Sequence, residues 1–254
     1  MKNKKLIITL IAVLSFISVV LVGFMIFAIC TNYVGLSVSN TLVVNKSFEN
    51  TFSELDISSQ AGDVYIYSTS DDTVKVKVYS AENKTNLEQN GDTLTLNVKS
   101  NNNFIFFRQN ISRVEVYVPQ SYNGNLKIQE NYGDIKVENF PSASVEIEQK
   151  CGDVKVAGCN SATVNNKYGD IKIEKINSYM NLNNNCGDIE VDEINLTKNS
   201  KITDSLGDIS IGFTNEIFIN AKTDLGDVKV NNNYHKSDIE LTVSNNCGDI
   251  KVNN

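Results

Sequence analysis

The sequence predicts an all-β protein, namely a short β-solenoid (β-helix) of about seven coils behind an antiparallel β lead-in, plus one N-terminal transmembrane helix. Two observations support the solenoid. A Gly-Asp pair recurs at steps of 17 to 22 residues through the C-terminal half, and strands that alternate apolar and polar residues flank each pair. The composition agrees, because a chain with no Trp, two prolines and abundant Asn, Ile and Val favours strands and turns over helices.

The N-terminal segment predicts a membrane anchor. Residues 6–29 are almost wholly apolar and follow Lys2, Lys4 and Lys5. As a helix they span roughly 36 Å, more than the ~30 Å hydrocarbon core, whereas a cleaved signal peptide has an apolar region of only ~7–15 residues. We therefore expect a single-pass protein of the bacterial cell membrane, with residues 1–5 as a cytoplasmic tail and the rest extracytoplasmic. Residues 31–44 read as a stalk.

Residues 45–124 contain several alternating strands and are predicted to form the antiparallel lead-in. Asn90-Gly91 matches a two-residue hairpin turn. Gly62-Asp63-Val64 resembles an outlying copy of the repeat. The first coil is therefore expected to be split by an insertion.

Residues 125–254 are predicted to form the Gly-Asp repeat solenoid. Stacking equivalent units brings Ile and Val into shared interior columns, which one unit cannot bury alone. We expect Ile135, Ile171 and Ile209 to lie in such a column. A third apolar column is expected seven residues after the glycine, at Phe140, Cys159, Ile176 and Ile194, and it is lost at Thr214 and Asn233. The glycines accept positive φ at the corners, so the structural turns are assigned to Gly62, Gly133, Gly152, Gly169, Gly187, Gly207, Gly226 and Gly248.

The residue before each of the seven glycines from Gly133 to Gly248 is Tyr, Cys or Leu, which predicts another apolar core column. Cys151, Cys186 and Cys247 occupy this position. Cys151 and Cys186 stand two coils apart, about 9.6 Å, which is beyond the ~7 Å reach of a disulfide. No bridge is expected among these three cysteines.

Stacking also aligns the aspartates that follow the glycines. Our first interpretation is mechanical: each carboxylate accepts hydrogen bonds from turn amides, and lysines two residues further on offset the charge. The alternative is a calcium-binding ladder, since regularly spaced carboxylates can supply oxygen ligands. Its members are Asp134, Asp153, Asp170, Asp188, Asp208, Asp227 and Asp249. No other metal site, no cofactor and no catalytic residue is predicted.

The charge balance narrows the choice of partners. Without the three N-terminal lysines, 30 acidic side chains stand against 20 basic ones. Nucleic acid is therefore not an expected partner. The membrane is contacted through residues 6–29, and we expect a protein or cell-surface partner whose identity the sequence does not give. Self-association through the C-terminal solenoid edge is a further expectation, because the chain stops at Lys251-Val252-Asn253-Asn254 without a capping segment.

These features resemble a family of bacterial putative-adhesin domains of unknown function. The resemblance covers Phe48 to Val252, and rests on Gly62-Asp63-Val64, the strand Val114 to Pro119, and the seven later Gly-Asp pairs. It implies a cell-envelope β-solenoid, often behind a membrane anchor, with links to adhesion or envelope-stress responses. It implies no catalytic residues.

Three classes of function follow. The first is a non-enzymatic, membrane-anchored adhesin-like or envelope scaffold protein. The second is an envelope-stress sensor or regulator that works through a partner membrane protein, because residues 1–5 are too short for an output domain. The third is a carbohydrate-active β-helix enzyme, for which the sequence offers little: no Trp, arginine only at Arg108 and Arg113, and a single histidine, His235, in a polar segment.

Overall fold

The computed structural model describes residues 37–38, 41–80, 85–99, 110–231 and 233–253, and every regular element in them is a β-strand. The prediction of an all-β protein is confirmed. Among these residues there is no helix of the length and apolar character needed to cross a bilayer. The expected anchor at residues 6–29 lies outside the described residues, as do residues 31–36 of the expected stalk.

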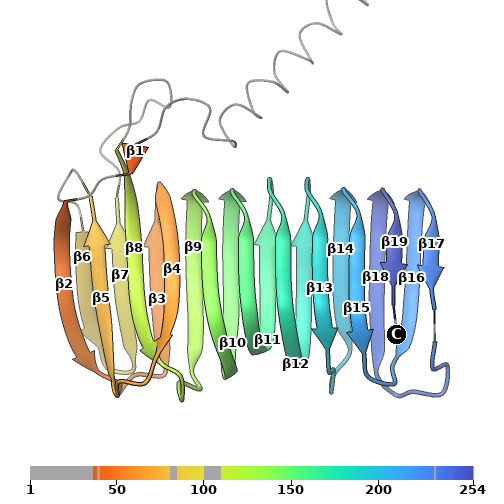
Figure 1. The fold of residues 1–254 in the computed structure, drawn as a ribbon, viewed down its shortest axis with the longest axis horizontal. Helices are drawn as coiled ribbons and strands as arrows, with labels where there is room; N and C mark the ends of the chain where they lie inside the picture. Colours follow the sequence, from red (N-terminus) through yellow and green to blue (C-terminus); the bar gives the residue numbers. More distant parts are fainter. Residues whose placement is uncertain (1–36, 39–40, 81–84, 100–109, 232, 254) are drawn as a thin grey trace, which may run out of the picture.

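The strands form two facing sheets whose members stack side by side along the long axis of the molecule (Figure 1). The upstream sheet holds the strands that precede the Gly-Asp pairs, and the downstream sheet holds those that follow them. The upstream sheet contains, in stacking order, β6 (Thr85–Asn90), β7 (Thr93–Val98), β3 (Glu54–Ser59), β9 (Asn125–Tyr132), the second halves of β10 (Ile135–Cys151), β11 (Val154–Asn166) and β12 (Ile171–Asn184), then β14 (Ser200–Leu206), β18 (Glu240–Cys247) and β16 (Phe218–Leu225).

The downstream sheet faces the upstream sheet. It contains, in stacking order, β2 (Leu42–Glu49), β5 (Thr73–Tyr79), β8 (Asn110–Pro119), β4 (Gly62–Thr69), the first halves of β10, β11 and β12, then β13 (Ile189–Ile194), β15 (Ile209–Thr214), β19 (Ile250–Val252) and β17 (Val228–Val230). The short β1 (Ser37–Val38) pairs with the start of β8.

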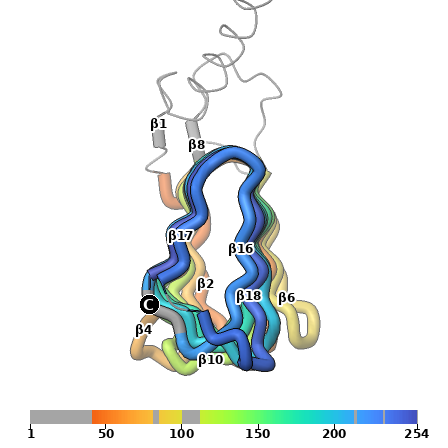
Figure 2. The backbone as a smooth tube through the Cα atoms, turned by 90° about the vertical axis from the view of Figure 1, so that its right-hand side faces the viewer, coloured from red at the N-terminus to blue at the C-terminus, as the bar shows by residue number. Residues whose placement is uncertain are grey.

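Figure 2, which looks along the stack, shows a narrow loop with two long limbs joined by an arch at the upper end. The Gly-Asp pairs lie at the arch, between the upstream and downstream strands. At the opposite, lower edge β10, β11 and β12 pass from one sheet to the other with a shift in register. The expected third column, Phe140, Cys159, Ile176 and Ile194, is buried there, so it fills the lower turn and is not a separate third side.

The interior is the predicted set of apolar columns. Ile135, Ile171 and Ile209 are at most 1% exposed. The register Ile135–Val154–Ile171 continues through the later coils without an offset. Equivalent side chains therefore lie over one another, as the solenoid prediction requires.

The lead-in is mixed, and the expectation of a purely antiparallel segment was wrong. β2 with β5, β5 with β8, and β6 with β7 are antiparallel, but β3 pairs in parallel with β7 and β9, and β4 with β8 and β10. The strands β3 and β4 are the outlying repeat around Gly62, and they stack directly on the coil at Gly133. The hairpin turn is Gly91-Asp92, because Asn90 pairs with Thr93.

The C-terminal coil is not the end of the stack, which corrects the expectation of an open edge at Lys251 to Asn254. β18 and β19 lie between β14–β15 on one side and β16–β17 on the other. At this end of the described chain the outermost strands are therefore β16 and β17. Packing explains the exchange: Leu241, Val243, Ile250 and Val252 are fully buried in the inner layer, whereas the outer coil offers smaller residues at matching positions, such as Ala221.

Candidate interaction surface along the Gly-Asp arches

The arch glycines are required by close backbone packing between coils. The eight glycines assigned as structural turns have φ between 128° and 154°. A Cβ at Gly187 would lie 2.2 Å from the carbonyl oxygen of Gly169 in the adjacent layer. Any other residue would therefore clash with the neighbouring arch as well as strain its own backbone.

The aspartates after these glycines form a continuous hydrogen-bonded ladder. The N–H of Asp188 donates to Oδ1 of Asp170 at 2.8 Å, and Asp208 donates to Asp188 at the same distance. The pattern holds from Asp63 to the terminal layer with distances of 2.8–3.1 Å, through Asp134, Asp153, Asp170, Asp188, Asp208, Asp249 and Asp227. Each carboxylate except that of Asp227, in the last layer, thus accepts an amide of the next coil, which is the mechanical role first assigned to it.

The lysines of the repeat do not pair with this ladder. Lys172 binds Glu190 at 2.8 Å and Lys155 binds Glu174 at 3.0 Å, both on the outer face of the downstream sheet. Among the described residues no three His, Cys, Asp or Glu side chains come together as a metal site. The calcium alternative for the ladder stays an untested prediction.

A buried polar column lies beneath the arches, three residues before each glycine, and the sequence reading missed it. Asn184 donates its side-chain amide to the carbonyl oxygens of Gly169 and Gly187, both at 3.0 Å. Asn166 does the same one layer away. The column comprises Ser59, Glu130, Gln149, Asn166, Asn184, Asp204 and Asn245, which are buried, and the half-buried Thr223 in the outermost layer. When the repeats of the sequence are aligned on their glycines, this recurrence of Asn and Gln three residues earlier becomes visible.

Two members of this column are acids in an interior that disfavours charge. Burial raises the pKa of Glu130 to about 8, although Oε1 accepts the N–H groups of Asn131 and Tyr132. Burial likewise raises the pKa of Asp204 to about 6. Oδ2 of Asp204 has no hydrogen-bond partner among the described residues.

The column immediately before the glycines faces outward, so the prediction of an apolar core column was wrong. Tyr132, Tyr168, Leu206 and Leu225 are 41%, 42%, 54% and 69% exposed. Strand alternation would place them inside, but the buried polar residue two positions earlier is the last inward side chain before the backbone bends into the arch. We call this column together with the aspartate ladder the arch edge.

Two of the three cysteines at this position also face outward, and Cys151 is the exception. Cys186 and Cys247 are exposed free thiols, so neither is bonded to Cys151, which is buried. Cys159, at the lower turn, is a buried free thiol whose pKa burial raises to about 12. The arch edge thus presents acidic, aromatic, aliphatic and thiol groups in two parallel rows.

A second group of aromatic residues lies on the outer face of the downstream sheet near its N-terminal end. Tyr65 stacks on Tyr67, and Tyr67 on Tyr117, with ring centroids 6.0 and 5.1 Å apart. The Lys77 ammonium lies 4.7 Å from the Tyr117 ring centroid. These side chains cover one another's faces, which makes the row mainly a stabilising cross-strand contact.

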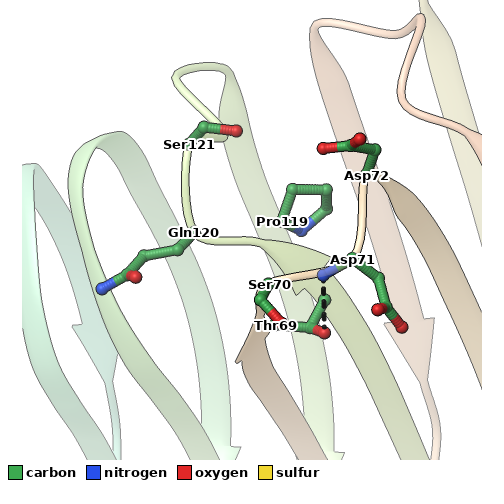
Figure 3. Close-up of a pocket in the computed structure, with 7 residues that line it drawn as sticks. All are labelled: Thr69, Ser70, Asp71, Asp72, Pro119, Gln120 and Ser121. Carbon is green, nitrogen blue, oxygen red and sulfur yellow. Dashed lines mark hydrogen bonds between the residues drawn. The ribbon is translucent and has the colours of Figure 1, made fainter.

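One hollow of about 400 Å³ lies at the turns that follow β4 and β8 (Figure 3), lined by Thr69, Ser70, Asp71, Asp72, Pro119, Gln120 and Ser121. The Asp71 N–H donates to Oγ1 of Thr69 at 3.1 Å. Its lining offers hydroxyl, carboxylate and amide groups, and contains no histidine, cysteine or lysine. His235 is exposed at the other end of the stack, where its ring packs against Phe218.

A solved structure with the same architecture is found among known proteins. The structure of a putative adhesin from Bacteroides fragilis is similar over 86% of this chain and 100% of that chain, at 17% identity and a TM-score of 0.54. A putative cell adhesion protein from Clostridium sporogenes matches over 83% of this chain and 99% of its own, at 15% identity and a TM-score of 0.37. No curated protein matches. The Toastrack DUF4097 family matches residues 52–254, which confirms the resemblance inferred from the repeats, and the chain belongs to that family.

Proposed function

We propose that this protein is a non-enzymatic, membrane-anchored extracytoplasmic scaffold of adhesin-like type that binds a partner protein through the arch edge. The observation that supports it is the arch edge itself. Tyr132, Tyr168, Leu206 and Leu225 stay exposed on a rigid repeat, next to an unbroken row of carboxylates. Exposed aromatic and aliphatic side chains aligned in this way are typical of interaction surfaces.

Cross-linking on intact cells, followed by mass spectrometry of captured proteins, tests the arch edge. The test variant replaces Tyr132, Tyr168 and Leu206 with Ser. The matched control replaces Tyr234, which is 39% exposed and lies beside Ile217, at the end of β16 away from the arch. Loss of a specific partner in the test variant alone supports the proposal. Capture of the same proteins by both variants refutes the arch edge as the binding site.

The proposed topology has its own test. A membrane-impermeant maleimide added to intact cells reaches the exposed thiols of Cys186 and Cys247 only if the repeat is extracytoplasmic. We expect labelling before permeabilisation. Labelling that requires permeabilised cells contradicts the topology and leaves the arch-edge experiment to be judged separately.

One observation favours the alternative of a sensor or regulator that works through a partner membrane protein. β1 pairs with residues Asn110 and Ile111, just before Ser112 of β8 pairs with the arch residue Gly62. The chain therefore enters the domain on the arch side. Residues 30–36 extend at most roughly 25 Å, so an anchor at residues 6–29 holds this side near the membrane. Capture of a membrane protein supports this role, and loss of host-cell attachment on deletion supports adhesion.

A further inference from the structure

The end of the stack formed by β16 and β17 has free hydrogen-bonding groups. The N–H of Phe218 donates to the carbonyl of Ile239, so alternate residues of β16 face β18 and the others face away. The Asn233 side chain satisfies both backbone groups of Ile219, at 2.8 Å each. Among the described residues no strand pairs with the outward groups of Ala221 and Thr223.

β17 is open in the same way. The N–H of Ile250 donates to the carbonyl of Asp227, and the N–H of Asn231 donates to that of Val252. The N–H and C=O groups of Val228 and Val230 consequently point away from β19. Val228 is also 44% exposed, although its equivalents in the inner coils are buried. The end therefore exposes apolar interior as well as unpaired backbone.

The geometry of this end selects its partner. β16 and β17 run in opposite directions in two facing sheets about 10 Å apart. A binding partner must offer two edges with the same spacing and opposite directions. The same end of a second copy does so after a half-turn about an axis perpendicular to both sheets, which pairs β16 with β16 and β17 with β17 in antiparallel fashion.

We propose that the protein forms a two-fold symmetric, end-to-end dimer through β16 and β17. Thr223 lies on the axis in one sheet and Val228 in the other, where the outward backbone groups of each bond to those of its own equivalent. These residues stand three before and two after the arch glycine Gly226. Their heights therefore differ by about one residue, ~3.3 Å, over the ~10 Å between the sheets, so an axis close to perpendicular passes through both.

The charges of the end are self-complementary in this register. With Thr223 opposite Thr223, Lys222 of one copy lies across from Asp224 of the other, and the reverse. With Val228 opposite Val228, Asp227 meets Lys229 in the same reciprocal way. All four side chains are exposed in the single chain. Charged residues normally discourage pairing at an edge, but here their order favours one antiparallel alignment and penalises its neighbours.

Charge exchange tests the dimer. Lys222→Asp places carboxylates opposite one another, and Asp224→Lys places ammonium groups opposite one another. We expect each variant of the full-length chain, purified in mild detergent, to dimerise about tenfold more weakly by light scattering. An equimolar mixture of the two variants restores opposite charges in the mixed dimer, and the doubly exchanged variant restores them in its own. Both should recover wild-type association.

Lys201→Asp is the matched control, because Lys201 is an exposed lysine on the inner strand β14 of the same sheet. It should leave the dimer unchanged, and circular dichroism separates lost association from lost folding. Three results each overturn the proposal: a wild-type chain that stays monomeric or forms head-to-tail polymers, a mixture that does not recover, or a control as weak as the test variants.

Discussion

Asp204→Asn should stabilise the protein at neutral pH, because it replaces a buried acid in the column of amides beneath the arches. Asp204 is 0% exposed, and its neighbours in the column are Asn184 and Asn245. The carbonyl of Gly187 receives one side-chain amide, whereas that of Gly169 receives two. An asparagine at position 204 can supply the missing donor while still accepting the N–H of Ser205, now at 2.8 Å from Oδ1 of Asp204.

The size of the effect follows from the pKa of Asp204. Burial raises it from 3.8 to about 6, so the folded state holds this proton more tightly than the unfolded chain does. The corresponding stability is fully present below about pH 3.8 and is lost as the pH rises through about 6. The span between the two pKa values corresponds to about 3 kcal/mol at 1.36 kcal/mol per pKa unit.

Urea unfolding followed by circular dichroism at pH 4 and pH 7.5 measures this difference. The variant should match the wild type at pH 4 and exceed it by about 3 kcal/mol at pH 7.5. Asp208→Asn, on the exposed ladder of the same coil, is the control and should change stability by less than about 0.5 kcal/mol at either pH. An Asp204→Asn gain that is absent at pH 7.5, or equal at both pH values, would refute the reasoning.

Three further predictions concern other parts of the arches and core. Glu130→Gln should raise the melting temperature progressively between about pH 4.5 and 8 and no further above, because the pKa of Glu130 is raised to about 8; a gain independent of pH contradicts it. Gly187→Ala should lower the free energy of unfolding in urea by at least about 3 kcal/mol. Gly91→Ala is the control, with φ of 56° and no atom within 4 Å of the new Cβ, and should lower it by about 1 kcal/mol. Similar losses in the two variants would show that the arch contact is unimportant. Cys186 should react with maleimide in the folded protein and Cys159 only after unfolding, because the Cys159 thiol is buried, as peptide mass spectrometry can check; early labelling of Cys159 would contradict the core assignment.

The repeat could be predicted from the sequence because its determinants are local. The Gly-Asp pairs and the alternating strands that follow them predicted the length of one coil, the buried side chains such as Ile135 and Ile171, and the outlying copy of the repeat at Gly62. The same alternation failed at the arch. It predicted Tyr132 to be a core residue, although the chain bends after the buried Glu130 and turns Tyr132 outward.

The order of the layers could not be read from the sequence, because stacking order depends on competition between coils. The coil at Gly248 fills the inner position with Leu241 and Val243, while the coil at Gly226 supplies Ile219 and Ala221. The step of 22 residues between these glycines, against 19 before it, shows a longer connection but not which layer it reaches. The predicted open edge was therefore assigned to the wrong strands.

The exchanged order of the last two coils has a consequence for how the protein is made. During vectorial synthesis residues 218–230 emerge before residues 240–252, yet the later segment occupies the layer on which the earlier one rests. The nascent chain cannot finish this end one turn at a time. This end of the stack is complete only after residues 240–252 have inserted between β14–β15 and β16–β17. It should therefore be the last part of the protein to acquire protection from amide exchange.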